Sequence, residues 1–127
     1  MFNYTKISQT TGTAPRQILF NVMHQVSVGV MVDSTMASVT QNGRKIVKAG
    51  TPLTGDLTAR GTPFKAAGEA NAVGVLLHDV DITEGNANGS LLIWGFVNLN
   101  RLESDTQALV TAGVKSTLSG KVTFLKD

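Results

Sequence analysis

Apolar and polar positions alternate over a long stretch in the N-terminal third of the chain. Every second residue is apolar or histidine, namely Ile18, Phe20, Val22, His24, Val26, Val28, Val30 and Val32. This period of two, with many β-branched side chains, predicts a β-strand. The sixteen residues from Gln17 to Val32 would span about 53 Å when extended, more than the diameter of a domain of this length. We therefore expect the strand to break near Gln25 to Gly29, or its first half to leave the body.

Asn-Gly dipeptides, which favour the positive φ angles of a tight hairpin turn, occur at two places in the chain. Asn42-Gly43 separates the segments 37–41 and 44–48. Asn88-Gly89 lies in a loop between two apolar, β-rich runs within residues 72–102. We expect a hairpin at each dipeptide. Glycine and proline interrupt residues 50–64, which indicates a loop with short strands at most.

The spacing of apolar residues becomes helical near the C-terminus. Ser104 and Gln107 form a candidate capping box. In this motif the serine hydroxyl accepts from a free backbone N–H, and the glutamine side chain three residues later accepts from the serine N–H. Gly120 is placed to end the helix, and residues 121–125 predict a closing strand. The apolar positions at helical spacing are Leu109, Val110, Val114 and Leu118.

Together these elements predict a mainly β fold, a small β-sandwich or barrel-like domain with one C-terminal α-helix and an extended N-terminal arm. Residues 1–15 are polar and have no periodicity, which is typical of an extended or disordered segment. We place the arm at residues 1–26 and the β-rich domain at residues 27–127.

The composition of the chain fits one globular domain, and its low share of charged residues fits burial in an assembly. The chain has 127 residues, 42% of them hydrophobic, which suits one globular domain. Only 16% are charged, whereas about 25% is usual, so burial of neutral surface in an assembly is one explanation. Residues 1–65 carry a net charge of +5 and residues 66–127 carry −3, and these halves could complement each other within the fold or between subunits.

Several chemical classes are disfavoured by the residues present. The chain has no cysteine, hence no disulfide, thiol nucleophile or thiolate metal site. Its N-terminus lacks the pattern of a signal peptide, and no apolar run approaches the roughly 18 residues of a membrane span. Arg44, Lys45 and Lys48 form a basic group without interleaved aromatics, which favours a solvated strand end over stacking on single-stranded bases.

The remaining candidates for catalysis or metal binding also favour structural roles. His78 precedes Asp79, but adjacent side chains on a strand point to opposite faces, so His78 would lie with Leu76, Val80 and Ile82 as a structural histidine. His24 receives the same interpretation. An acidic and amide cluster could hold Ca²⁺, yet the sixth position of an EF-hand loop counted from Asp79 is glutamate, so a solvated loop is favoured. The cluster comprises Asp79, Asp81, Glu84, Asn86 and Asn88. We expect no enzyme activity, no cofactor and no bound metal.

Both faces of the apolar run at residues 91–99 are hydrophobic, which predicts burial on both sides. One face carries Leu91, Ile93, Val97 and Leu99, and the other carries Leu92, Trp94 and Phe96. Either the helix that begins at Asp105 or a neighbouring subunit must cover the second face. We therefore expect Trp94 to be buried and take Leu92, Trp94 and Phe96 as candidate oligomer-interface residues.

Four runs of the sequence together resemble a known class of phage proteins. They read AGTPL at 49–53, AVGVLLHDVD at 72–81, GFVNLNR at 95–101 and VKSTLSGKVTF at 114–124. This pattern of hydrophobic residues and turns resembles the short head fibre or head decoration proteins of tailed bacteriophages. Because the chain is short, a decoration protein is the better match than a fibre.

The resemblance implies a virion structural protein, made in the host bacterial cytoplasm, that decorates the outer capsid surface and stabilises or extends it. Its partners would be the major capsid protein and two further copies of itself in a homotrimer. The N-terminal arm would attach to the shell, with Phe2, Tyr4, Ile18 and Phe20 as candidate contacts. We expect the segment before about Gln25 to become ordered only on the capsid.

The alternative function is a β-barrel module that binds a small ligand or single-stranded nucleic acid through its basic N-terminal half. Binding to phosphates weakens steeply with salt, whereas apolar docking does not, so the salt dependence of binding separates the two functions.

Overall fold

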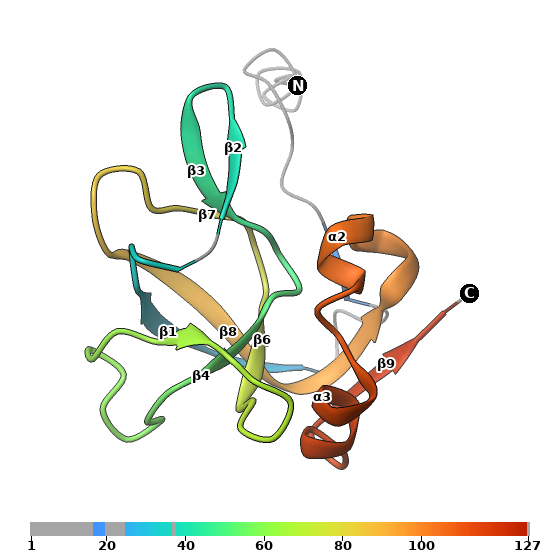
Figure 1. The fold of residues 1–127 in the computed structure, drawn as a ribbon. Coiled ribbons are helices and arrows are strands. Elements are labelled where there is room, and N and C mark those ends of the chain that lie inside the picture. Colours follow the sequence, from blue (N-terminus) through green and yellow to red (C-terminus); the bar gives the residue numbers. More distant parts are fainter. Residues whose placement is uncertain (1–16, 20–24, 37, 127) are drawn as a thin grey trace, which may run out of the picture.

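A computed structural model describes residues 17–19, 25–36 and 38–126 of the chain. The fold is mainly β with a short helical region near the C-terminus, as the sequence predicts (Figure 1). The strands are β1 (Val26–Val32), β2 (Val39–Gln41), β3 (Arg44–Val47), β4 (Pro52–Thr54), β5 (Lys65–Ala66), β6 (Gly74–Leu76), β7 (Val80–Asp81), β8 (Ala87–Asn98) and β9 (Val122–Leu125). The helices are η1 (Leu99–Arg101), α2 (Ser104–Gln107) and α3 (Ala112–Thr117).

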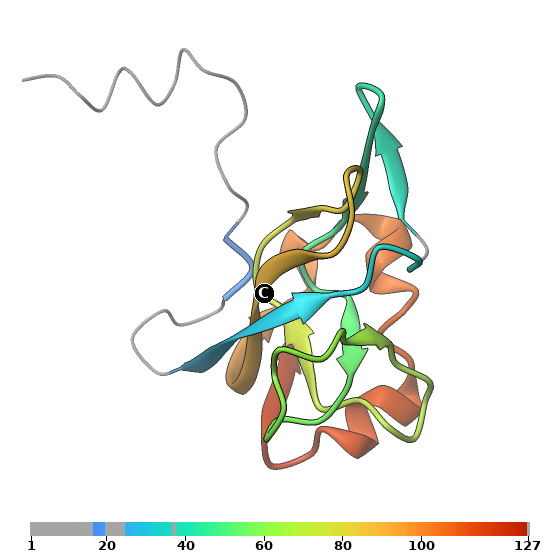
Figure 2. The same ribbon diagram turned by 90° about the vertical axis from the view of Figure 1, so that its left-hand side faces the viewer.

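The strands form two sheets, with β8 at the centre of the larger one. Its antiparallel order is β1-β8-β6-β4-β5, and β9 pairs in parallel with the C-terminal half of β8. The smaller sheet has the order β2-β3-β7, and its β2–β3 hairpin projects from the body (Figures 1 and 2).

The core consists of two hydrophobic clusters that meet at β8. Leu91 belongs to the first, which also contains Phe64 and Leu76 and is called the Phe64 cluster below. The adjacent Leu92 belongs to the second, the Val97 cluster. Side chains from the helical region complete the Val97 cluster, namely Leu102, Val110, Val114 and Leu118. The second face of β8 is therefore covered at Leu92 by this chain's own helical region.

The long alternating segment breaks close to where the sequence predicts. Strand β1 begins at Val26, within the expected range. Ile18 and Leu19, however, lie in the Val97 cluster, and Ile18 is fully buried. Leu19 forms a bridge with Val97, and the Asn98 N–H donates to the Ile18 carbonyl at 2.9 Å. The boundary at residue 26 therefore needs correction, because Ile18 and Leu19 belong to the body rather than to an arm.

Of the two hairpins predicted at Asn-Gly dipeptides, the structure contains one. The hairpin at Asn42-Gly43 is confirmed, with φ angles of 54° and 78° that suit a two-residue turn between β2 and β3. The turn predicted at Asn88-Gly89 is wrong, because these residues lie inside β8, opposite Met31 and Val30 of β1. Gly89 serves packing instead, since a Cβ there would come within 2.9 Å of a methyl group of Val80.

The predicted C-terminal helix is present as two short helices. Thr111 has an extended backbone and its hydroxyl accepts from the Val114 N–H at 3.3 Å, so it caps α3 and separates it from α2. The capping box is absent. Glu103 is the N-cap of α2 but makes no side-chain capping hydrogen bond, and the Gln107 amide donates to the Leu102 carbonyl at 3.0 Å. The closing strand is confirmed as β9.

Candidate interaction surface

An apolar surface remains open to water where β1 begins beside β8. Val26 and Trp94 are cross-strand partners, and they are 47% and 43% exposed. Half-buried Phe96 meets Trp94 edge to face, with ring centroids 6.2 Å apart and an interplanar angle of 68°. We call Val26, Trp94 and Phe96 the Trp94 patch. Aromatic side chains are typical anchors of protein interfaces, because they bury a large area with few rotatable bonds.

An irregular register explains why Trp94 is exposed. Val26 lies opposite Trp94, but the next residue of β1, Ser27, lies opposite Leu92. Ile93 is therefore an extra residue on β8, and such a bulge changes which way the following side chains point. The prediction of a buried Trp94 is wrong for this reason.

The bulge also divides the three predicted interface residues. Leu92 is fully buried in the Val97 cluster, so it cannot contact a neighbour. Trp94 and Phe96 lie together and keep exposed surface. Val26 joins them and was not predicted, because only the cross-strand pairing brings it beside Trp94.

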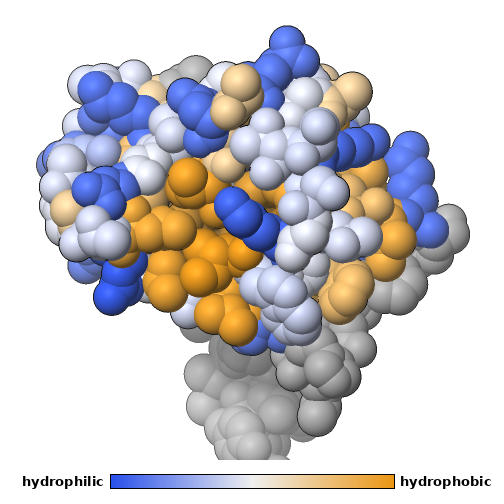
Figure 3. Space-filling view, turned by 90° about the horizontal axis from the view of Figure 1, so that it is seen from below, coloured by the Kyte–Doolittle hydropathy of each residue, from blue (hydrophilic) through white to orange (hydrophobic). Residues whose placement is uncertain are grey.

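The Trp94 patch does not include all the apolar side chains that the described part of the chain exposes. Seen from below, hydrophobic side chains gather in the middle of one face (Figure 3). Half-buried side chains that pack against the Phe64 cluster include Val28, Val73 and Ile93. Among the residues that the structure describes, the other large exposed apolar side chains are Leu57 and Leu109, which lie in loops, and single exposed residues of this kind are common.

The basic group near the β2–β3 hairpin is largely compensated by acidic residues from the second half of the chain. Arg44 Nε lies 2.7 Å from Asp81 Oδ2, and Arg44 Nη2 lies 3.6 Å from Glu84 Oε2. The Arg44 guanidinium, together with the Thr83 hydroxyl and N–H, lowers the pKa of Asp81 to about 2. Part of the charge complementarity between the two halves therefore operates within the fold.

Lys48 is buried, with 8% of its surface exposed, and its ammonium is surrounded by oxygen atoms. Lys48 Nζ lies 2.6 Å from Gln41 Oε1, 3.3 Å from Glu103 Oε2 and 3.8 Å from Asp79 Oδ2. A buried charge requires such partners, because desolvation of an unpaired ammonium costs several kcal/mol. With Arg44 and Lys48 paired in this way, binding of nucleic acid through the basic group loses its main support.

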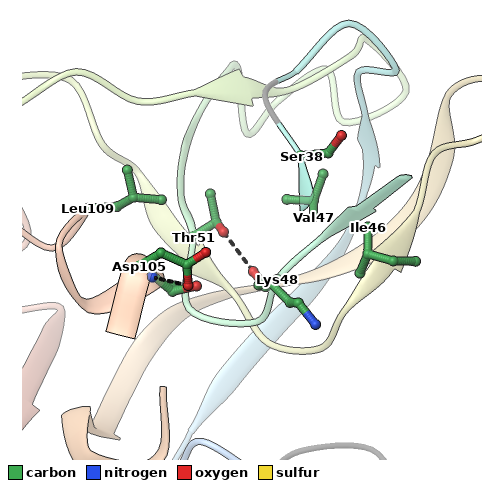
Figure 4. A pocket seen from close by; sticks show the side chains of 8 residues that line it. Ser38, Ile46, Val47, Lys48, Thr51, Asp105 and Leu109 are labelled. Atoms are coloured by element: carbon green, nitrogen blue, oxygen red, sulfur yellow. Dashed lines mark hydrogen bonds between the residues drawn. The ribbon is translucent and has the colours of Figure 1, made fainter. Parts of the chain in front are cut away.

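A pocket of about 210 Å³ lies between β3 and α2 (Figure 4). Two of its polar lining groups already have partners: the Thr51 hydroxyl donates to the Lys48 carbonyl at 2.6 Å, and Asp105 accepts from the Thr106 N–H at 3.0 Å. Figure 4 shows the Lys48 ammonium pointing away from Thr51 and Asp105. Ligand sites commonly measure about 300–1,000 Å³ and contain convergent polar groups, so this pocket is a weak candidate.

His78 and its acidic neighbours do not form a site of the kinds considered above. β6 ends at Leu76, so the strand alternation stops there and His78 is exposed in a bend, contrary to the packed position we predicted. Asp79 accepts from the Ala49 N–H at 2.8 Å, and Asn86 accepts from the Ser34 N–H at 2.8 Å. Among the described residues, no three metal-ligating side chains gather, and no helix is long and apolar enough to cross a membrane. His24 lies outside the described residues.

The capsid-contact candidates fall into two groups. Ile18 is fully buried in the body, so it is not available to a capsid protein without leaving the core. Phe2, Tyr4 and Phe20 lie outside the described residues.

No protein-family model matches the sequence, and no curated protein matches it at a significant level. Its function is therefore inferred from its own residues and surface.

Proposed function

We propose that this chain is a virion structural protein that decorates the outer surface of a bacteriophage capsid. It binds the major capsid protein, stabilises or extends the head surface, and assembles as a homotrimer. It acts without catalysis, cofactor or metal.

The Trp94 patch is the observation that carries this proposal. The domain buries both faces of its central strand β8 at Leu91 and Leu92, in the two core clusters. The side chains of Val26, Trp94 and Phe96 nevertheless remain partly exposed to water. Apolar side chains on neighbouring strands gain free energy when a second protein covers them, at about 25 cal/mol per Å² of apolar area. In a closed oligomer every copy contributes the same surface, so the patch meets a neighbour in each subunit.

Attachment to the shell is assigned to the residues that precede the body. Because Ile18 and Leu19 are part of the core, the attaching segment is residues 1–16, with Phe2 and Tyr4 as its aromatic side chains. Several copies of this segment on one oligomer would add avidity to weak individual contacts.

The proposed assembly is tested by comparing Trp94→Ala with Leu109→Ala in solution. Both residues are large, apolar and almost equally exposed, but only Trp94 belongs to the patch. Sedimentation at micromolar concentration should give a trimer for the wild type and Leu109→Ala, and a smaller species for Trp94→Ala. Trp94→Ala with an unchanged mass would contradict the assignment of the interface.

Capsid binding is tested with a truncation that begins at Gln17 and therefore retains Ile18 and Leu19. We expect this protein to fold and to keep its oligomeric state, but to fail to co-sediment with undecorated capsids of the source phage. If the truncated protein still occupies the capsids fully, the capsid contact lies on the body and not on residues 1–16. No binding by the full chain at all would reject the decoration function itself.

A further inference from the structure

The two Asn-Gly dipeptides have the same local sequence chemistry but different structural settings. Asn42-Gly43 forms the exposed tip of the β2–β3 hairpin. Asn88-Gly89 lies within β8, in the larger sheet. This contrast has a chemical consequence, because Asn-Gly is the dipeptide most prone to spontaneous deamidation.

Deamidation needs the backbone to bend until two neighbouring groups meet. The backbone nitrogen that follows asparagine attacks the side-chain amide carbon, a five-membered succinimide forms, and ammonia leaves. Water then opens the ring at either carbonyl and gives aspartate or isoaspartate, with no oxidant or reductant involved. Glycine in the second position removes the side chain that would obstruct the attack.

The tip of the β2–β3 hairpin meets these requirements. Asn42 and Gly43 are both exposed, and no atom lies within 4 Å of the position that a Gly43 Cβ would occupy. β2 has three residues and, among the described strands, pairs only with β3. Short edge hairpins open locally at a low free-energy cost, so Asn42 can leave its φ of 54° and reach the reactive geometry.

Asn88-Gly89 is held by the sheet and by the core. Asn88 lies opposite Met31, and Gly89 lies opposite Val30 in the β1–β8 ladder. A Cβ at Gly89 would come within 3.2 Å of three core side chains, so the backbone is packed closely there. Bending this segment into a succinimide requires the larger sheet to separate, which is opening on a global scale.

We infer that Asn42 is a site of spontaneous deamidation in the folded protein and that Asn88 is protected from it. The isoaspartate product adds one methylene to the backbone of a two-residue turn, which disturbs the Gln41–Arg44 pairing. It also places a new carboxylate next to Arg44, where it competes with Asp81 for the guanidinium. The modification therefore loosens the hairpin that supplies Gln41 to the buried Lys48.

The experiment follows both asparagines in the full chain by peptide mapping and mass spectrometry during incubation at mildly alkaline pH, below the unfolding temperature. Deamidation is detected as the increase in peptide mass that follows when O replaces NH. Methylation by an isoaspartyl methyltransferase identifies the isoaspartate. We expect Asn42 to convert at least about tenfold faster than Asn88, because reactions of protected segments follow their opening free energy. In concentrated urea both sites should convert at similar rates.

Asn42→Gly provides the matched control, because Gly-Gly also suits a two-residue hairpin turn. This variant should lose the fast conversion and retain the slow one at Asn88. Equal rates for the two sites in the folded protein would overturn the inference. Conversion in urea alone would overturn it as well, because the hairpin would then protect Asn42.

Discussion

Replacement of Ile18 by alanine tests whether the body begins before β1. Ile18 is fully buried in the Val97 cluster, although it precedes β1 by eight residues and was predicted to belong to an arm. If this placement is right, Ile18→Ala leaves a cavity in the Val97 cluster, where the isoleucine side chain was packed. If residues 17–19 instead belong to a loose arm, the substitution has no effect on stability.

The size of the effect follows from burial. Truncating a fully buried isoleucine to alanine costs about 2–5 kcal/mol, as lost transfer free energy plus the cavity that remains. For a urea dependence of about 2 kcal/mol per molar, the unfolding midpoint should fall by roughly 1–2.5 M. Leu109→Ala removes a similar side chain that is 49% exposed, so it should change stability by less than about 0.5 kcal/mol.

Both variants are compared with the wild type by urea unfolding, followed by far-ultraviolet circular dichroism at one fixed protein concentration. The concentration must be constant because assembly raises the apparent stability. Equal midpoints for Ile18→Ala and Leu109→Ala would refute the placement of Ile18 in the core. A truncation beginning at Ser27 should then be as stable as one beginning at Gln17.

Three further predictions concern single positions. Gly89→Ala should destabilise by about 1–3 kcal/mol through overpacking, whereas Gly29→Ala, which meets no atom within 4 Å, should be neutral or stabilising by up to about 1 kcal/mol in thermal unfolding. Thr111→Ala should cost about 0.5–2 kcal/mol, since the cap of α3 is lost, and Thr111→Ser should restore most of it in the same assay. The Arg44 guanidinium holds the pKa of folded Asp81 at about 2, below its usual 3.8, so the stabilising contribution of this carboxylate is complete above about pH 4 and is lost as the pH falls toward 2. Urea midpoints of Asp81→Asn should therefore lie below those of the wild type at neutral pH and converge with them near pH 2; a constant difference would contradict the proposed pairing.

Several elements of this fold could be predicted because their causes are local. Asn42-Gly43 supplies both positive φ angles that its hairpin requires, so the turn needs no help from distant residues. Gln25 to Gly29 contains the start of β1 because an unbroken strand would outgrow the domain. β9 could be predicted from residue type, because β-branched and aromatic residues, which favour strands, follow the last helix.

Other features depend on partners that are distant in sequence. Lys48 resembles a solvated strand end until the fold brings Asp79 and Glu103 to its ammonium. Asn88-Gly89 has the residues of a turn, yet pairing with β1 and close packing at Gly89 hold it in a strand.

The sequence by itself determined the β character of this protein, its first hairpin and the apolar content of residues 91–99, because propensity, turn chemistry and hydrophobicity belong to individual residues. Only the tertiary structure decided which of those apolar residues remain exposed. One extra residue in the β1–β8 register leaves Leu92 in the core and Trp94 beside Val26 at the surface. Turn geometry fixes the register of strands that a hairpin connects, but β1 and β8 are far apart in sequence, so their register depends on contacts that form only in the folded sheet.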